Sequence, residues 1–311
     1  MKTSPVKPAD LAATVLSVPP LARLPDLAID RVANAKLIRH IEAGGIRTMM
    51  YGGNANFYNI GLYEMAGILD FLAETAGDDT WMIPSIGPDY GKMIDQADIL
   101  RSRAFPTAMV LPPSPPISIE GVAAGLRRVA DRFGRPLIVY IKAEGAVTPD
   151  TVARLIEDGA VCGVKYAIPR ANTLEDKFLT ELVERIGADK IVSGMGERPA
   201  IDHLKGFKLA AFTSGCVCIS PKASNAMLAA CRRGDWAEAE RIRKIFVAAE
   251  DLREKHGFIP VLHDAVTFSG IADMGRMLPL LSNVPDSLQP AVRKLAMDLL
   301  DAEGQFTQKA A

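Results

Sequence analysis

A lysine inside an apolar run is the first candidate for chemistry in this sequence. Lys165 lies in the segment 160–168, whose other members are almost all apolar or small. Burial disfavours the ammonium form and lowers the pKa of a lysine, and the neutral amine is the form that attacks a carbonyl carbon. Lys165 is therefore a candidate Schiff-base nucleophile. The alternative is a lysine at a strand end that extends to solvent or pairs with a carboxylate.

A tyrosine occupies the predicted strand before this lysine. Tyr140 ends the apolar run 137–141, and its phenol could transfer protons during the formation and breakdown of a carbonyl adduct. Lys142 shares the face of Tyr140 by strand alternation, so it is the rival amine. The alternative for Tyr140 is a core aromatic residue whose hydroxyl has a protein partner.

Two glycine-containing turns follow other predicted strands. Residues 51–58 read Tyr-Gly-Gly-Asn-Ala-Asn-Phe-Tyr, in which Gly53 and Asn54 could present amide donors to a carboxylate or phosphate. The alternative is an ordinary turn. Residues 193–198 read Ser-Gly-Met-Gly-Glu-Arg and lack the third glycine of a dinucleotide-binding fingerprint. Glu197 could bind a hydroxylated substrate or cap the next helix.

Charge and composition exclude several functional classes. The chain has 36 Lys and Arg against 37 Asp and Glu, and without a long basic run we expect no binding to nucleic acid or to an anionic membrane. The four cysteines and four histidines lack metal-ligand spacing, so we expect no metal and free thiols in a reducing cytoplasm. We also expect neither a signal peptide nor a membrane span, and hence a cytoplasmic protein.

Short apolar or β-branched runs alternate with segments of helical periodicity over the first two thirds of the chain. The predicted strands are 13–18, 48–51, 81–86, 108–111, 137–141, 161–166, 190–193 and 209–213. Helices are expected between them, and Thr148 before Pro149 predicts the N-cap of one. This alternation favours an α/β fold, a closed TIM (β/α)8 barrel, over an open doubly wound sheet.

The strand pattern ends near residue 219. Segments 220–233, 235–256, 259–269 and 287–302 have helical periodicity, with glycines and prolines between them. We therefore predict a barrel over 1–219 and a C-terminal helical domain over 220–311 that packs on the barrel.

Taken in order, these segments resemble the dihydrodipicolinate synthase/N-acetylneuraminate lyase family of class I aldolases. The similarity rests on the glycine-rich turn after the second strand, Val-Tyr on the fifth, Gly-Val-Lys on the sixth, Ser-Gly after the seventh, Thr-Ser-Gly after the eighth, and the segments 233–239 and 275–279. It implies a TIM barrel with C-terminal helices and a homo-oligomer, either a dimer or a tetramer. It also implies no metal or nucleotide cofactor.

The resemblance assigns roles to the candidate residues. Lys165 would form a Schiff base with a 2-oxo acid such as pyruvate, and Tyr140 would shuttle protons. The turn at Gly53 and Asn54 would hold the carboxylate of the acid. Substrate contacts would come from Thr213, Glu197 and Lys142.

Three departures from the family pattern bear on the reaction. The family commonly has Gly-Thr-Thr-Gly-Glu or Gly-Ser-Thr-Gly-Glu where this chain has Gly-Gly-Asn-Ala-Asn at 52–56. Dihydrodipicolinate synthases carry a tyrosine pair where segment 111–116 reads Leu-Pro-Pro-Ser-Pro-Pro, and an arginine where this chain has Gly145. The departures favour an aldolase or dehydratase of sugar acids, with Lys142, Glu144 and Glu197 as specificity groups. The alternatives are a 4-hydroxy-tetrahydrodipicolinate synthase and a non-catalytic protein that binds 2-oxo acids.

Overall fold

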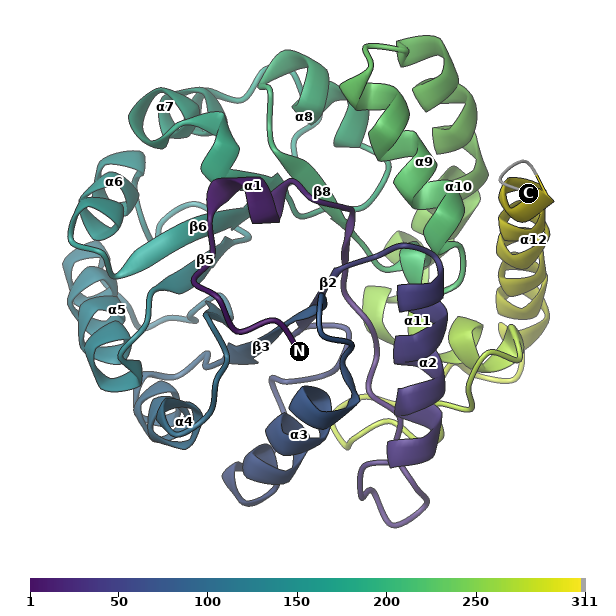
Figure 1. Ribbon diagram of the computed structural model, residues 1–311, viewed down its shortest axis with the longest axis horizontal. Coiled ribbons are helices and arrows are strands. Elements are labelled where there is room, and N and C mark those ends of the chain that lie inside the picture. Colours follow the sequence, from purple (N-terminus) through teal and green to yellow (C-terminus); the bar gives the residue numbers. More distant parts are fainter. Residues whose placement is uncertain (309–311) are drawn as a thin grey trace.

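The computed structural model describes residues 1–308, and its centre is a closed parallel barrel (Figure 1). The strands are β1 Leu16–Ser17, β2 Thr48–Tyr51, β3 Trp81–Ile86, β4 Ala108–Val110, β5 Leu137–Ile141, β6 Val161–Tyr166, β7 Ile191–Ser193 and β8 Ala211–Ser214. Each strand pairs with the next in the chain, and β1 pairs with both β2 and β8 to close the barrel. The predicted TIM barrel is confirmed, and the open sheet is excluded.

Helices surround the barrel and cover the outer faces of its strands (Figure 1). They are α2 Arg31–Ala43, α3 Leu62–Thr75, α4 Tyr90–Arg101, α5 Ile119–Phe133, α6 Pro149–Glu157, α7 Lys177–Ile186 and α8 Ala200–Gly206, with short 3-10 turns at Ala188–Lys190 and Cys216–Cys218. The short helix α1 Pro8–Leu11 lies inside this ring, over one end of the barrel (Figure 1). The predicted cap of α6 is confirmed, because Thr148 Oγ1 accepts a hydrogen bond from the Thr151 amide at 3.1 Å. Strands covered on both faces are buried along their whole length, as β2 and β3 are.

The chain continues after β8 into helices α9 Pro221–Arg232, α10 Trp236–His256, α11 Phe258–Phe268 and α12 Gln289–Gln308. In Figure 1 these helices lie together at one side of the barrel, next to α2. α9 begins two residues after the predicted domain boundary at residue 219.

Polar contacts fix α12 against the start of α9. The Ser220 hydroxyl donates to the Leu299 carbonyl, and the Glu303 carboxylate accepts from the backbone amides of Lys222 and Ala223 at 2.9 and 3.2 Å. These contacts therefore hold the last helix against the first helix that follows the barrel.

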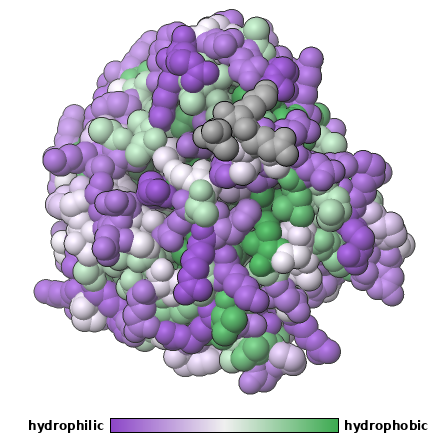
Figure 2. Space-filling model, turned by 45° about the vertical axis from the view of Figure 1, so that its right-hand side comes forward, coloured by the Kyte–Doolittle hydropathy of each residue, from purple (hydrophilic) through white to green (hydrophobic). Residues whose placement is uncertain are grey.

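The surface is mixed in character. The face shown in Figure 2 is mostly hydrophilic, with smaller hydrophobic areas between the charged side chains. No helix among residues 1–308 combines the length and the apolar character that crossing a membrane requires.

Candidate active site

Lys165 and Tyr140 lie side by side at the carboxyl ends of adjacent strands. The two residues are register partners in the β5–β6 ladder, and the Lys165 Nζ atom lies 4.3 Å from the centre of the Tyr140 ring. Lys165 is buried, with 5% of its surface exposed. Within residues 1–308 its ammonium has no carboxylate partner, although a buried cation normally has one.

Burial, together with the smaller effects of the positive charges of Lys142 and Arg253, lowers the pKa of Lys165 to about 7. A substantial fraction of the amine is therefore neutral at physiological pH. Burial also raises the pKa of the Tyr140 phenol, so this group keeps its proton and can donate it. The pair offers a nucleophilic amine packed against the ring of a residue that can donate a proton.

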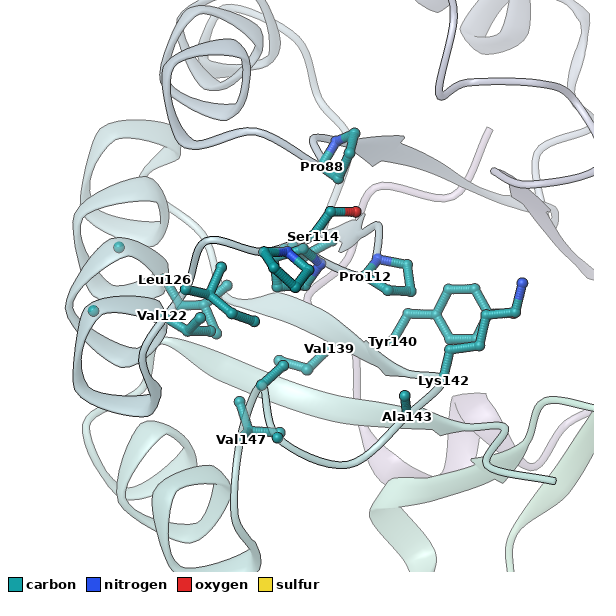
Figure 3. A pocket seen from close by; sticks show the side chains of 18 of the residues that line it. Pro88, Pro112, Ser114, Val122, Leu126, Val139, Tyr140, Lys142, Ala143 and Val147 are labelled. Atoms are coloured by element: carbon teal, nitrogen blue, oxygen red, sulfur yellow. The ribbon is translucent and has the colours of Figure 1, made fainter. Parts of the chain in front are cut away.

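A cavity of about 1270 Å³ opens beside Tyr140 and Lys142 (Figure 3). It extends from the ends of β4 and β5 to the first turns of α5, and segment 112–117 forms one wall. Val122 and Leu126 of α5 face Val139 across its apolar part (Figure 3). Lys142 is exposed at the rim and, within the described part of the chain, forms neither a hydrogen bond nor an ion pair.

The turn after β2 is built into the barrel mouth by close contacts. A Cβ on Gly52 would lie 2.7 Å from Ser85 Oγ, so only glycine fits there without a shift. The Asn54 amide group donates to the Val18 carbonyl at 2.8 Å, and its Oδ1 faces Arg253. Because this side chain is engaged, a carboxylate bound at Gly53 and Asn54 would meet the backbone of the turn.

Thr213 and Glu197 lie deeper than the rim of the mouth. Thr213 is buried in β8 opposite Leu16 of β1. Glu197 follows β7, has no exposed surface, and accepts a hydrogen bond from Ser224 Oγ at 2.7 Å. Its Oε2 atom has no hydrogen-bond partner within residues 1–308. Glu197 therefore faces the C-terminal helices.

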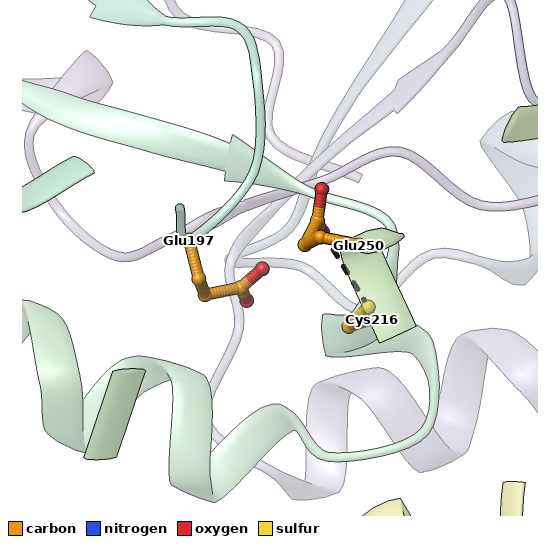
Figure 4. Close-up of side chains that lie close together, drawn as sticks. All are labelled: Glu197, Cys216 and Glu250. Carbon is orange, nitrogen blue, oxygen red and sulfur yellow. Dashed lines mark hydrogen bonds between the residues drawn. The ribbon is translucent and has the colours of Figure 1, made fainter. Parts of the chain in front are cut away.

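Glu197, Cys216 and Glu250 form a buried cluster (Figure 4). Burial and the nearby Glu250 raise the pKa of Glu197 to about 7. Burial also raises the pKa of the Cys216 thiol, which donates to Glu250 Oε1 at 3.6 Å. These three side chains could supply ligand atoms within 4.8 Å of one another. Arg253 already pairs with Glu250 at 3.3 Å, so a cation here would compete with the guanidinium.

Arg253 is the residue at this site that sequence analysis misses. It lies on α10, outside the barrel strands, yet its guanidinium reaches Asn54 in the turn after β2. A signal is present in the sequence: the buried face of α10 holds Ile242, Phe246 and Ala249 and continues through Glu250 and Arg253. Two charged residues that extend an apolar helix face indicate a buried ion pair.

Comparisons with known proteins agree with the sequence resemblance. No family model matches the chain. A Saccharopolyspora erythraea protein described as a probable 5-dehydro-4-deoxyglucarate dehydratase is 25% identical over 86% of this chain and 85% of its own length. The 4-hydroxy-tetrahydrodipicolinate synthase of Alkalilimnicola ehrlichii is 28% identical over 70% of this chain and 75% of its own.

Solved structures show the same fold. Dihydrodipicolinate synthase from Bacillus clausii superposes with a TM-score of 0.80 at 22% identity, covering 94% of this chain and 99% of that one. A prophage protein from Escherichia coli K12, described as a member of the dihydrodipicolinic acid synthase family and solved with pyruvate, superposes with a TM-score of 0.79 at 17% identity. The superposition covers 92% of this chain and 98% of that one. The chain is thus similar to proteins of the dihydrodipicolinate synthase family and shares their fold.

Proposed function

We propose that this protein is a lyase that acts on a 2-oxo acid through a Schiff base on Lys165. The observation that carries the proposal is the buried Lys165 amine against the Tyr140 ring, with a pKa lowered to about 7 and no carboxylate partner among residues 1–308. Such an amine is available as a nucleophile near neutral pH.

The proposed reaction begins with attack of the neutral Lys165 amine on the carbonyl carbon of the acid. The carbinolamine that forms loses its hydroxyl as water to give an imine. Tyr140 supplies and receives the protons of these steps, since its phenol remains protonated. The protonated imine withdraws electrons from the neighbouring carbon. In dehydration this carbon loses a proton, and the hydroxyl on the next carbon takes up a proton and leaves as water. In aldol cleavage the hydroxyl on that next carbon loses its proton instead, and the bond between the two carbons breaks to release an aldehyde and leave the enamine.

Elimination of water from a deoxy sugar acid is the reaction that we favour. The names of two relatives support it, since the Saccharopolyspora erythraea and Streptomyces coelicolor proteins are both described as probable 5-dehydro-4-deoxyglucarate dehydratases. Gly145 and the proline-rich segment 111–116 occupy the positions where the synthases have arginine and tyrosines, so synthase activity is disfavoured.

We further propose a cytoplasmic homo-oligomer that needs no metal or nucleotide. The family resemblance supports assembly into a dimer or tetramer, and four free cysteines suit a reducing compartment. Light scattering on the purified protein tests the assembly. Activity that persists in the presence of a chelator would support a metal-free reaction, and loss of activity that zinc or magnesium restores would contradict it.

Borohydride trapping tests the proposal directly. The protein is incubated with pyruvate or a 2-keto-3-deoxy sugar acid, reduced, digested and analysed by mass spectrometry. We expect the adduct on the peptide that contains Lys165 and none after Lys165→Ala. Lys142→Ala is the matched control, because it removes the rival amine and should leave trapping intact. An adduct found only on Lys142 would contradict the assignment.

Turnover decides between an enzyme and a binding protein. A panel of sugar acids and aldehydes is assayed for dehydration and for release or consumption of pyruvate. Trapping on Lys165 without turnover of any panel member would favour the non-catalytic alternative.

A further inference from the structure

Arg253 is a buried cation from the C-terminal helices that reaches the mouth of the barrel. Its side chain is only 6% exposed, a value close to the 5% of Lys165. Its positive charge adds to the lowering of the Lys165 pKa and opposes burial, the larger effect, which raises the pKa of Tyr140. Two cations that lie close together in a buried site repel each other unless an anion lies between them.

The guanidinium is held loosely by its protein partners. It donates to Glu250 Oε1 and the Phe258 carbonyl, each at 3.3 Å, and to Asn54 Oδ1 at 3.5 Å. Hydrogen bonds from arginine to carboxylates are normally about 2.7–2.9 Å, and a guanidinium has five N–H donors. Arg23, another buried arginine, meets Glu64 at 2.7 Å. Arg253 therefore retains donor capacity for a further acceptor.

The backbone around Arg253 leaves room for the guanidinium. A Cβ on Gly215, just after β8, would lie 2.8 Å from Nη2 and 2.9 Å from Nη1. Any other residue at 215 would push the guanidinium away from the barrel mouth. Its contact with Asn54 places it beside the turn after β2, where the carboxylate of the 2-oxo acid is expected.

Glu250 balances the charge of Arg253 only in part. The pKa of Glu250 is raised, chiefly by burial, and its Oε1 is shared between Arg253 and the Cys216 thiol. Glu197 behind it has a pKa raised to about 7, so it carries only part of a negative charge at neutral pH. Together with unpaired Lys142, these groups leave the mouth with positive charge that an anion can neutralise.

We propose that Arg253 binds the carboxylate adjacent to the carbonyl of the 2-oxo acid, with Glu250 as the residue that positions the guanidinium. This inference rests on the proposed function, because it concerns the same substrate. The anchor comes from α10 and acts together with the backbone of the turn after β2. It compensates for the hydroxyl pair that this turn lacks.

The test compares pyruvate with pyruvamide, its neutral amide, in trapping titrations. The variants are Arg253→Lys and the double variant Arg253→Met with Glu250→Gln, which removes both charges of the buried ion pair together. Arg198→Met is the matched control, because Arg198 makes exposed ion pairs with Asp251 and Glu254 on the same helix. Thermal unfolding of each variant shows that it is folded.

We expect the double variant to raise the pyruvate concentration at half-saturation about 10- to 100-fold, the range for loss of a charge-assisted hydrogen bond. Pyruvamide should be trapped as in the wild type. For Arg253→Lys, the pyruvate concentration at half-saturation should lie between those of the wild type and the double variant. Arg198→Met should leave the half-saturation concentrations of both ligands unchanged. An equal loss of trapping for pyruvate and pyruvamide would show a merely structural role and would overturn the proposal. Unchanged trapping of pyruvate would also overturn it.

A non-covalent measurement separates this inference from the proposed function. Calorimetry of pyruvate binding is performed in the Lys165→Ala background, with and without the Arg253 substitution. If wild-type protein forms no adduct but pyruvate binding depends on Arg253, the Schiff-base proposal fails and the anchor stands. If adducts form and this binding is independent of Arg253, the anchor fails alone.

Discussion

Lys165 should control the pH dependence of the first chemical step. Its pKa, lowered to about 7 by burial and by neighbouring charges, makes the ammonium the dominant form below that pH. We expect the rate of trapping with pyruvate to rise about tenfold per pH unit up to pH 7 and to level off above it. The rate is measured by stopping the reaction with borohydride after fixed times at pH values between 5 and 9. A midpoint near 10 would show that the amine is not desolvated.

The same burial should make Lys165 costly for stability. The unfolded lysine binds a proton up to about pH 10.5, whereas the folded one releases it near pH 7, so wild-type stability should rise with pH between these values. Lys165→Met should therefore stabilise the fold by roughly 2–4 kcal/mol at or below pH 7. The gain should shrink toward pH 10, as measured by urea unfolding at several pH values. A gain independent of pH would contradict this origin.

Lys142 is the exposed cation at the rim of the cavity, and its role should depend on the substrate. We expect Lys142→Met to weaken binding of 2-oxo acids with a second, distal carboxylate by about 3- to 30-fold, the range for a partly exposed ion pair. Pyruvate has only one carboxylate and should bind nearly as before. Comparing KM for the two acids in both proteins measures this, and a parallel loss for both would exclude distal recognition.

At the scale of elements, close packing between β6 and β7 fixes the position of Lys165. A Cβ on Gly194 would lie 2.8 Å from Ala167 Cβ, 2.9 Å from the Tyr166 carbonyl and 3.0 Å from Lys165 Cγ. We expect Gly194→Ala to cost about 1–3 kcal/mol, as other overpacked cores do, and to reduce trapping. Gly67→Ala on α3 is the control, because no atom lies within 4 Å and it should stabilise by about 0.5–1 kcal/mol. Urea unfolding distinguishes the two.

The strands of the barrel were predictable because their apolar runs are short and bounded by turn residues. β2, β3, β5 and β6 have the predicted bounds. β1 was predicted over 13–18 but contains only Leu16 and Ser17. Thr14 explains part of the difference, since its hydroxyl accepts from the Arg47 amide and donates to the Val15 carbonyl, a local turn that sequence periodicity does not reveal.

The candidate site was predictable only where its residues lie on the barrel strands. Strand alternation and the order of strands were enough to place Lys165 beside Tyr140, as the register confirms. The pattern of α10 indicates that Arg253 is buried, but its contact with Asn54 depends on how the helix packs across the barrel mouth, which this pattern does not specify. Glu197 was expected among substrate contacts, and its burial under the C-terminal helices depends on the same packing.

At the scale of the whole molecule, α12 should contribute to stability through the contacts it makes with α9. The Glu303 carboxylate accepts hydrogen bonds from two backbone amides in the first turn of α9. We expect Glu303→Ala to lower the free energy of unfolding by about 1–3 kcal/mol, since it leaves these amides unpaired. Asp301→Ala, at an exposed position of the same helix, should have little effect. Equal effects in chemical unfolding would exclude the capping role.

The reach of α10 into the barrel mouth has a consequence for how proteins with this fold could diversify. Barrel enzymes are usually altered through the loops that follow their strands. Here a side chain encoded almost ninety residues after Lys165 reaches the same space. Exchange of the whole C-terminal segment between relatives would therefore carry acid selectivity with it while the strands stay unchanged. Recombination at the junction before α9 becomes a route to new substrates.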